Sequence, residues 1–320
     1  MKPEKQKTSV AVLSVLSNTF LIILKLAIGI IIGSVAIISE AIHSTIDLLA
    51  AIIALLAIKK SNQPADQDHA YGHGKFENLS GGIEVLLIFV ASAGIIFEAI
   101  RKLINPQPIE AVGWGIGVMF ISSVVNFFIS HLLFQVGNKT DSFALQADAW
   151  HLRTDVYTSV GVMIGLISLW GGEQLFPKTN WHWIDPTIAL IVALLIIKAG
   201  YSLSRQAVYG LLDVRLPSEE EAWVKAKIQQ LYPQIRSFHN FRSRKAGATR
   251  FVEFHLVLDP TMSVQESHQI NDQLVQAIKT RFKDSKVMVH IEPCDNTCES
   301  KCQESCWIKR KDSSNAEGGI

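Results

Sequence analysis

The chain has 320 residues, of which 48% are hydrophobic and only 18% are charged, and its formal net charge is +1. A soluble domain typically carries about 25% charged residues, so this composition excludes a single soluble domain and a disordered chain. The balanced charge gives no basic excess that would indicate nucleic-acid binding. All four cysteines lie between Cys294 and Cys306, whereas a secreted disulfide scaffold would distribute them through the fold.

Six segments are apolar enough to cross a bilayer as helices, which takes about 20 residues. They cover residues 9–32, 35–58, 79–104, 112–134, 143–170 and 184–208. The first is too long for the apolar part of a signal peptide and is followed directly by another span. The sequence therefore predicts a membrane α-helical domain over residues 1–210 with six transmembrane helices.

The basic residues of the short loops indicate the orientation in the membrane. Six spans place both ends of the chain on one side, and the loops on that side carry Lys2, Lys5, Lys7, Lys59, Lys60, Lys75, Lys139 and Arg205, against Arg101, Lys102 and Lys178 on the other. This bias predicts cytoplasmic N- and C-termini in the cell inner membrane. The cysteines would then face a reducing compartment.

The chain after the sixth span has the pattern of a small α+β domain over residues 211–293. Ser218 and the three glutamates after it mark a helix start. That helix would end near residue 232, followed by strands over 238–243 and 250–258, a helix over 264–282 and a strand over 286–292. The predicted order is αββαβ, and residues 294–320 are predicted to form a mobile tail that contains the cysteines.

Ionisable residues recur inside the second and fifth spans in the same pattern, acid-Ala-x-His-x-x-x-Asp. The second span carries Glu40, His43 and Asp47, and the fifth carries Asp148, His151 and Asp155. A charge at mid-bilayer costs about 2.5–3.5 kcal/mol on insertion scales, so such residues are functional candidates. Residues four apart share a helix face, so each span would present one imidazole together with one carboxylate.

Two such faces would supply two imidazole nitrogens and two carboxylate oxygens, which fits tetrahedral zinc. Magnesium and calcium prefer oxygen ligands alone. A histidine and an aspartate can also simply bond each other within one helix, but the repetition in two spans favours a metal. The motif lies in the middle span of each group of three, so the halves would be inverted repeats, a recurring transporter plan. Four protein ligands leave no position open for water, which favours carrying the ion over catalysis.

These motifs resemble those of the cation diffusion facilitator family, and of its bacterial YiiP-type members in particular. Residues 34–47 are similar to the family's second-span motif, residues 147–155 to its fifth-span motif, and residues 72–77 to its loop between spans two and three. The resemblance covers residues 9–294. It implies a six-span exporter of divalent metals, a metallochaperone-like cytoplasmic domain, a homodimer, and exchange of the metal for protons.

The resemblance also implies three metal sites. The transport site would consist of His43, Asp47, His151 and Asp155, and the form with histidine at position 43 is associated in the family with zinc. A loop site would consist of Asp66, His69 and His73. A dimetal cluster between cytosolic domains would use His239, His255, His268, His290 and Glu292, where the family often has Asp. Lys75 and Asp213 would form a salt bridge that links the membrane part to the cytosolic part across the dimer.

The sequence thus predicts a zinc/proton antiporter that works by alternating access, not an enzyme. Zinc needs neutral imidazole and ionised carboxylate, and histidine titrates near 6.5, so protonation would expel the metal. The alternatives are an exporter of Fe²⁺, Cd²⁺ or Mn²⁺ in the same family, a membrane metalloenzyme, and a metal sensor. Cys294, Cys298, Cys302 and Cys306 lack the usual Cys-x-x-Cys zinc spacing, and we expect them to have no role in transport.

Overall fold

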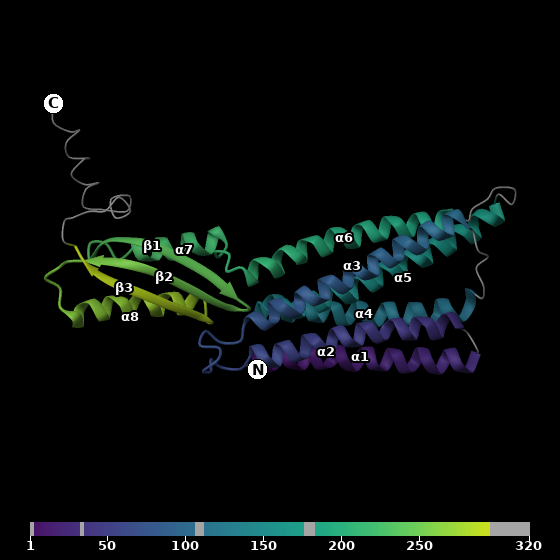
Figure 1. The fold of residues 1–320 in the computed structure, drawn as a ribbon, viewed down its shortest axis with the longest axis horizontal. Coiled ribbons are helices and arrows are strands. Elements are labelled where there is room, and N and C mark those ends of the chain that lie inside the picture. Colours follow the sequence, from purple (N-terminus) through teal and green to yellow (C-terminus); the bar gives the residue numbers. More distant parts are fainter. Residues whose placement is uncertain (1–2, 33–34, 106–111, 176–182, 295–320) are drawn as a thin grey trace, which may run out of the picture. The chain divides into compact units, whose positions relative to one another are not determined.

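The computed structural model describes residues 3–32, 35–105, 112–175 and 183–294, and the chain divides into two compact units, Met1–Leu211 and Leu212–Ile320 (Figure 1). The described part of the first unit consists of long helices: α1 (Pro3–Ile32), α2 (Val35–Ser61), α3 (Lys75–Ile104), α4 (Val112–Thr140), α5 (Phe143–Leu175) and α6 (Ile184–Leu211). The second unit contains α7 (Ser218–Gln229), β1 (Ile235–Ala246), β2 (Thr249–Leu258), α8 (Val264–Arg281) and β3 (Ser285–Pro293).

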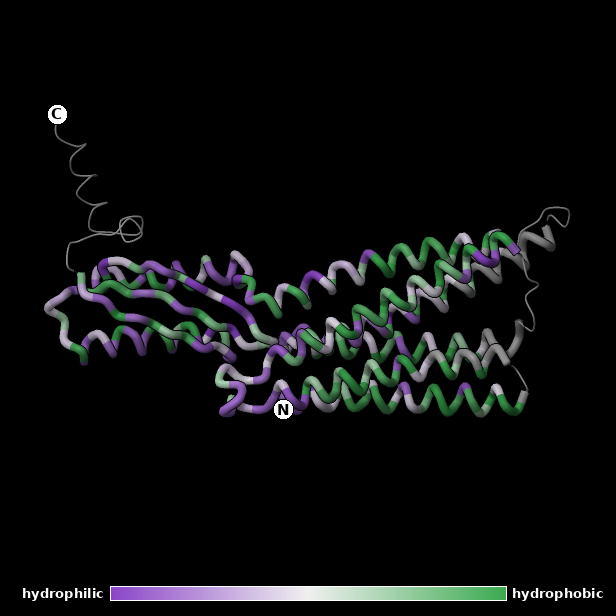
Figure 2. Tube along the Cα trace, viewed as in Figure 1, coloured by the Kyte–Doolittle hydropathy of each residue, from purple (hydrophilic) through white to green (hydrophobic). Residues whose placement is uncertain are grey.

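Four helices of the first unit are long and apolar enough to cross a membrane, judged over the described residues. These stretches are Pro3–Ile31, Lys75–Ile104, Gly117–Thr140 and Pro186–Leu211. Figure 2 shows their hydrophobic colouring. Helices α2 and α5 occupy the places of the predicted second and fifth spans and carry the ionisable motifs. The prediction of a membrane helical domain is confirmed.

Small residues let the helices of the bundle pack closely. Helix α1 packs on α2, α3 on α6, and α4 on α5. Gly81 of α3 lies so near the Phe143 ring of α5 that a Cβ atom there would be 2.3 Å from a ring carbon. Val10 and Ala11 of α1 pack in one buried cluster with Leu145 and Leu152 of α5. The start of α5 therefore lies among α1, α3 and α4.

The second unit is a three-stranded sheet with two helices. The strand order is β1-β2-β3, with β1 antiparallel and β3 parallel to β2. Strand β1 turns into β2 at Gly247, whose φ of 58° suits a residue without a side chain. A capping box of Ser263 and Glu266 begins α8. The predicted order αββαβ is confirmed.

The two helices of this unit pack on one face of the sheet. The core joins Val224 and Ile228 of α7 and Leu274 of α8 to Phe254 and Leu256 of β2. Alternation along β2 puts Glu253 and His255 on the opposite face. Because this core belongs wholly to the unit, we expect the unit to fold independently.

Several boundaries differ from the sequence-based ones. Helix α1 begins at Pro3 rather than residue 9, and α4 continues to Thr140 rather than residue 134. Hydropathy marks only the part of a helix that suits the bilayer, whereas backbone hydrogen bonding continues through polar turns beyond it. The first strand is likewise longer than predicted, because it pairs with β2 up to the turn.

Candidate metal-binding sites

The loop between α2 and α3 brings together Asp66, His69 and His73. One ligand atom from each lies within 4.8 Å of the other two. The backbone N–H of His69 donates to Asp66 Oδ1 over 2.7 Å. Chiefly because of this hydrogen bond, the pKa of the Asp66 carboxyl is lowered from its ordinary value. The carboxyl is therefore ionised when the histidines are neutral, which is the state that a metal needs.

His73 is oriented as a metal-binding imidazole usually is. Its buried ring has Nδ1 3.1 Å from the backbone carbonyl of Pro64, which can only accept a hydrogen bond, so Nδ1 carries the proton. The Nε2 lone pair then faces Asp66 Oδ2 at 3.2 Å. Two lone pairs this close favour a cation between them. The sequence did not reveal Pro64, because a backbone carbonyl gives no signal in the residue pattern.

A second group lies inside the membrane unit and consists of Asp47 of α2 with His151 and Asp155 of α5. His151 Nε2 is 3.1 Å from Asp47 Oδ1, and both side chains are at least nine-tenths buried. A cavity of about 550 Å³ borders all three residues, and a second one of about 200 Å³ borders Asp47 and Asp155. His43 belongs to α2, but its side chain lies outside the part that the structure describes.

Arg153 lies between His151 and Asp155 in the sequence, yet it faces another helix. Its Nε donates to Ser130 Oγ over 3.2 Å, and its guanidinium lies 4.9 Å from the ring centre of Phe127. Both partners belong to α4. The positive charge of Arg153 is therefore directed away from the Asp47 and His151 pair.

A third group lies on the sheet of the second unit. Register aligns His239 of β1 with His255 of β2, and His255 with His290 of β3. The ring centres of neighbouring histidines are 5.1 and 4.8 Å apart. Glu292 lies 3.2 Å from His239 Nε2 and 2.7 Å from His255 Nδ1, through different oxygens. These contacts form one cluster of nitrogen and oxygen donors.

His290 and His268 relate differently to this cluster. His290 Nε2 is 3.5 Å from Glu292 Oε1, and its side chain is 65% exposed. His268 is exposed on α8, with Nε2 3.4 Å from Asp272 Oδ2, one turn further along its own helix. Within this chain, the grouping of donor atoms therefore contains His239, His255 and Glu292.

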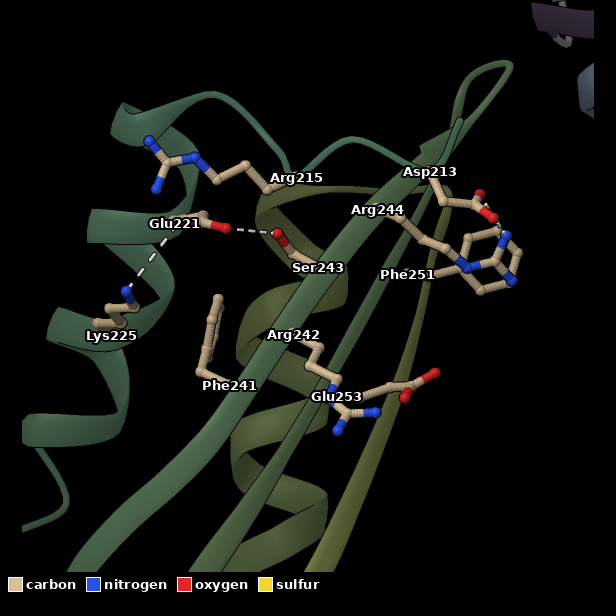
Figure 3. A pocket seen from close by; sticks show the side chains of 10 residues that line it. All are labelled: Asp213, Arg215, Glu221, Lys225, Phe241, Arg242, Ser243, Arg244, Phe251 and Glu253. Carbon is tan, nitrogen blue, oxygen red and sulfur yellow. Dashed lines mark hydrogen bonds and ion pairs between the residues drawn. The ribbon is translucent and has the colours of Figure 1, made fainter. Parts of the chain in front are cut away.

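Within this chain, the two predicted salt-bridge residues, Lys75 and Asp213, each contact another residue. Lys75 Nζ donates to the Leu211 carbonyl over 3.1 Å. Asp213 accepts from Arg244 over 3.0 Å, beside a cavity of about 520 Å³ (Figure 3). Cys294 is half-buried and directly follows β3. Cys298, Cys302 and Cys306, with the rest of the predicted tail, lie outside the described residues.

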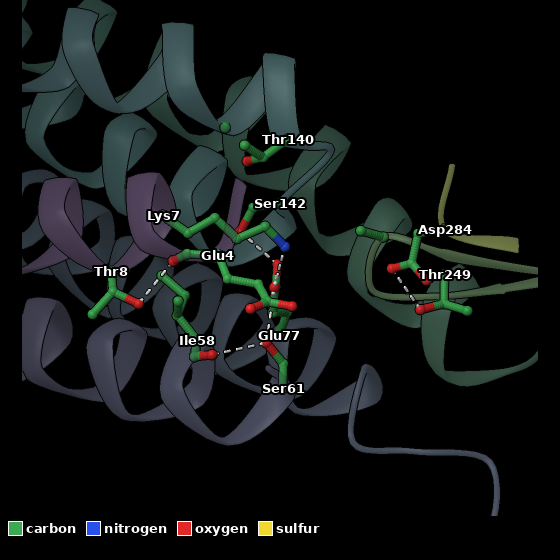
Figure 4. A network of polar contacts seen from close by, with 12 residues as sticks. Glu4, Lys7, Thr8, Ile58, Ser61, Glu77, Thr140, Ser142, Thr249 and Asp284 are labelled. Carbon is green, nitrogen blue, oxygen red and sulfur yellow. Dashed lines mark hydrogen bonds and ion pairs between the residues drawn. The ribbon is translucent and has the colours of Figure 1, made fainter. Parts of the chain in front are cut away.

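Sequence reasoning missed a buried ionic contact at one end of the bundle. Glu77 of α3 is 1% exposed and accepts from Lys7 Nζ of α1 over 2.9 Å. It also accepts from Ser61 of α2 over 2.9 Å and from Ser142, before α5, over 2.5 Å (Figure 4). The acid in the first turn of a hydrophobic helix was the available signal. Its partners lie too far along the chain for spacing to identify them.

The membrane helical bundle holds a buried group of His and Asp donors, and the α+β unit carries a group of His and Glu donors. These features together favour the class of membrane transporters for metal cations. Residues 11–212 match the family model described as the cation efflux transmembrane domain, and residues 216–294 match that of the cation efflux protein cytoplasmic domain. The chain belongs to the cation efflux, or cation diffusion facilitator, family. It is a cation efflux transporter and not an enzyme.

Several relatives cover most of the chain, and two of them are a transporter of Synechocystis and an efflux pump of Klebsiella pneumoniae. The transporter sll1263 of Synechocystis is 34% identical over 286 residues, which are 89% of this chain and 90% of that protein. The cation-efflux pump FieF of Klebsiella pneumoniae is 33% identical over 261 residues, 82% of this chain and 84% of that protein. The metal-bound C-terminal domain of the CzcD transporter from Thermotoga maritima is 25% identical, covers 25% of this chain and 93% of that structure, and has a TM-score of 0.23.

Proposed function

We propose that this transporter exports Zn²⁺ from the cytoplasm in exchange for protons. The observation that carries the proposal is the buried group of Asp47, His151 and Asp155, to which His43 would add a fourth ligand. In tetrahedral zinc, ligand atoms lie about 3.4 Å apart, given bonds of about 2.1 Å. The present spacing needs only small side-chain movements to reach that arrangement. Imidazole also favours zinc over magnesium and calcium.

Proton exchange follows from the same ligands. A metal binds the neutral imidazole and the ionised carboxylates, so its arrival displaces protons and protonation displaces it. If the site faces the cytoplasm in one state and the outside in another, these two reactions alternate. The proposal includes the inner membrane as location, cytoplasmic termini, and the two-domain division near residue 210.

The test is zinc flux into vesicles that contain the purified protein and a zinc-sensitive dye, under an imposed acid step. We expect flux from the unaltered protein and its loss in His151→Ala. His131→Ala is the matched control, because His131 is an exposed histidine of α4 whose Nε2 contacts Gln135. A zinc-impermeable vesicle with correctly folded protein would contradict the proposal. Substituting Fe²⁺, Cd²⁺ or Mn²⁺ for zinc tests the alternative cargoes.

We also propose a homodimer that metal stabilises through the cytoplasmic unit. The exposed His290 would be a further ligand of the cluster of His239, His255 and Glu292. His268 would complete a dimetal site between two copies. The Lys75–Asp213 salt bridge would link the membrane and cytosolic parts across this dimer. The loop group of Asp66, His69 and His73 would be a more exchangeable site, since it has three ligands.

A further inference from the structure

Two carboxyl groups lie buried in the membrane unit and belong to none of the metal groups above. Glu84 of α3 and Asp148 of α5 are both 0% exposed. Neither carboxyl group has a charged hydrogen-bond partner among the described residues, and the polar neighbour of Asp148 is the neutral hydroxyl of Ser14. The two groups are electrostatic neighbours. An unpaired buried acid needs a physical explanation, and here two occur together.

The position of the pair follows from the Glu77 contact. Lys7 and Ser142 both donate to the Glu77 carboxylate near the starts of α1, α3 and α5, so these three helices begin at the same end of the bundle. Seven residues make about two helical turns and return to the same face. Glu84 lies seven residues after Glu77, and Asp148 lies six after Ser142. The close approach of Gly81 to Phe143 holds these helices together between the two levels.

The residue of α1 at the level of Glu84 and Asp148 explains why these two carboxyl groups lack a counter-charge. Seven residues after Lys7 stands Ser14, which acts on the Asp148 carboxyl. Asn18, one turn further on, shares its face. Both side chains are at most 3% exposed and carry no charge, and Asn18 Nδ2 has no hydrogen-bond partner among the described residues. Ser14 and Asn18 thus lie beside Glu84 and Asp148, whereas Glu77 has the ammonium group of Lys7 beside it.

The charged groups around the pair do not neutralise two carboxylates. Besides Glu84, those that act on Asp148 are His151 of its own helix and Asp47 of α2, and His151 Nε2 faces Asp47. The next lysine of α1, Lys25, donates a hydrogen bond to Ser44 Oγ over 2.7 Å. Burying an ionised carboxylate without a partner is so costly that such groups take up a proton instead. Two carboxyl groups that share a site cannot both ionise readily.

We propose that Glu84 and Asp148 form a proton-binding site, separate from the metal ligands, with Ser14 and Asn18 as its polar neighbours. The two carboxyl groups hold at least one proton. Asp148 lies one helical turn before His151 on α5. The site therefore keeps a proton beside the metal group without occupying a metal ligand. Its occupancy is a property of the resting protein and does not require zinc flux.

The test is infrared spectroscopy of the full-length protein in lipid vesicles at neutral pH, where a protonated carboxyl group shows a C=O stretch that an ionised one lacks. We expect this band in the unaltered protein and a shift of it in D₂O. We expect it to change in Glu84→Gln and in Asp148→Asn and to be lost in the double variant. Glu98→Gln is the matched control, because Glu98 is an exposed acid of the same helix and should leave the band unchanged.

Two results would overturn the proposal. One is the absence of the band in the unaltered protein, a reading that depends on no variant and on no folding control. The other is a band that persists in the double variant. A failure of zinc flux would contradict the proposed function and leave the band unaffected, so the two proposals fail separately.

Discussion

His73 and His151 each turn Nε2 towards an aspartate oxygen, at 3.2 and 3.1 Å. Asp66 and His73 come from one loop, whereas Asp47 and His151 come from two helices, and in both contacts the backbone holds the two donors in place before a cation arrives. Such preorganisation reduces the cost of ordering the ligands on binding. The two contacts differ in their solvent exposure, because the loop group is partly exposed and the membrane group is mostly buried. At the residue scale, the site is decided by which single atom each side chain presents.

We predict that His43→Asp shifts transport from zinc towards cadmium by several-fold. The substitution replaces an imidazole with an oxygen donor, which changes the ligand set and loosens its preference for zinc. The measurement is the ratio of zinc to cadmium flux in vesicles, with His131→Asp as the control. An unchanged ratio would show that position 43 does not determine selectivity.

We predict an acid-range pH dependence of cytoplasmic-unit stability that comes from Asp259. Hydrogen bonds from Thr261 and the ion pair with Arg236 hold its pKa well below the ordinary 3.8. The unfolded chain therefore binds the proton more readily than the folded unit. The stabilisation is present above a pH of about 3.8, the pKa of the unfolded chain, and is lost as the pH falls through the lowered pKa of the folded unit. Urea unfolding of the unit across this range should show it, and Asp259→Asn should flatten the profile.

At the element scale, a bulge in β1 decides where His239 points. The register of β1 against β2 shifts between His239 and Arg242, and Asn240 within it has a φ of 51°. A bulge makes two residues oppose one and redirects the side chains beside it. Beside this local irregularity, His239 of β1 meets Glu292 of β3 across the central strand β2.

We predict that Asn240→Val destabilises the cytoplasmic unit by about 1–2 kcal/mol, because a branched side chain strains a left-handed backbone. Asn240→Gly, which suits that conformation, should leave stability within a few tenths of a kcal/mol. Urea unfolding of both variants gives the comparison. Equal losses in the two would argue against backbone strain as the cause.

Another element-scale prediction concerns the Glu77 contact that joins α1, α2, α3 and the start of α5. Lys7→Met alone leaves a buried carboxylate without its cation and should cost about 3–5 kcal/mol. Lys7→Met with Glu77→Gln should recover part of that loss, since no charge is then left unpaired. Thermal unfolding of the single and double variants forms the cycle. Additive losses would mean that the two residues act independently.

At the scale of the whole molecule, the first compact unit carries the membrane group and the loop group, and the second carries the cytoplasmic cluster. We predict that His255→Ala weakens zinc binding to the cytoplasmic cluster and zinc-dependent dimer compaction, while the membrane group still binds. His151→Ala should do the reverse. Calorimetry of the full-length protein, with scattering for compaction, checks both. If either variant abolished binding at both groups, the two sites would not be separate.

Much of the architecture could be predicted from residue patterns alone. The spans followed from runs of apolar residues. The αββαβ order followed from alternation, from the acidic helix start after Ser218 and from the turn at Gly247, although Ser218 itself makes no capping hydrogen bond to any described residue. In the sequence, His239, His255 and His290 of the cytoplasmic unit are separate positions. Each strand contributes one of them, and only the strand register places them side by side. Glu292 was identified by resemblance, but its contact with two histidines depends on pairing that local propensity does not encode.

The sequence by itself determined that this protein spans a membrane, that it carries a repeated His/Asp motif, and which family it resembles. These are properties of composition and of short spacing, which a helix converts directly into shared faces. Only the tertiary structure decided that His151 meets Asp47 across 104 residues and that Glu77 has a lysine partner, whereas Glu84 and Asp148 have no lysine partner within the part of the chain that the structure describes. Such facts depend on how helices pack, and packing sums many weak contacts between residues distant in the chain.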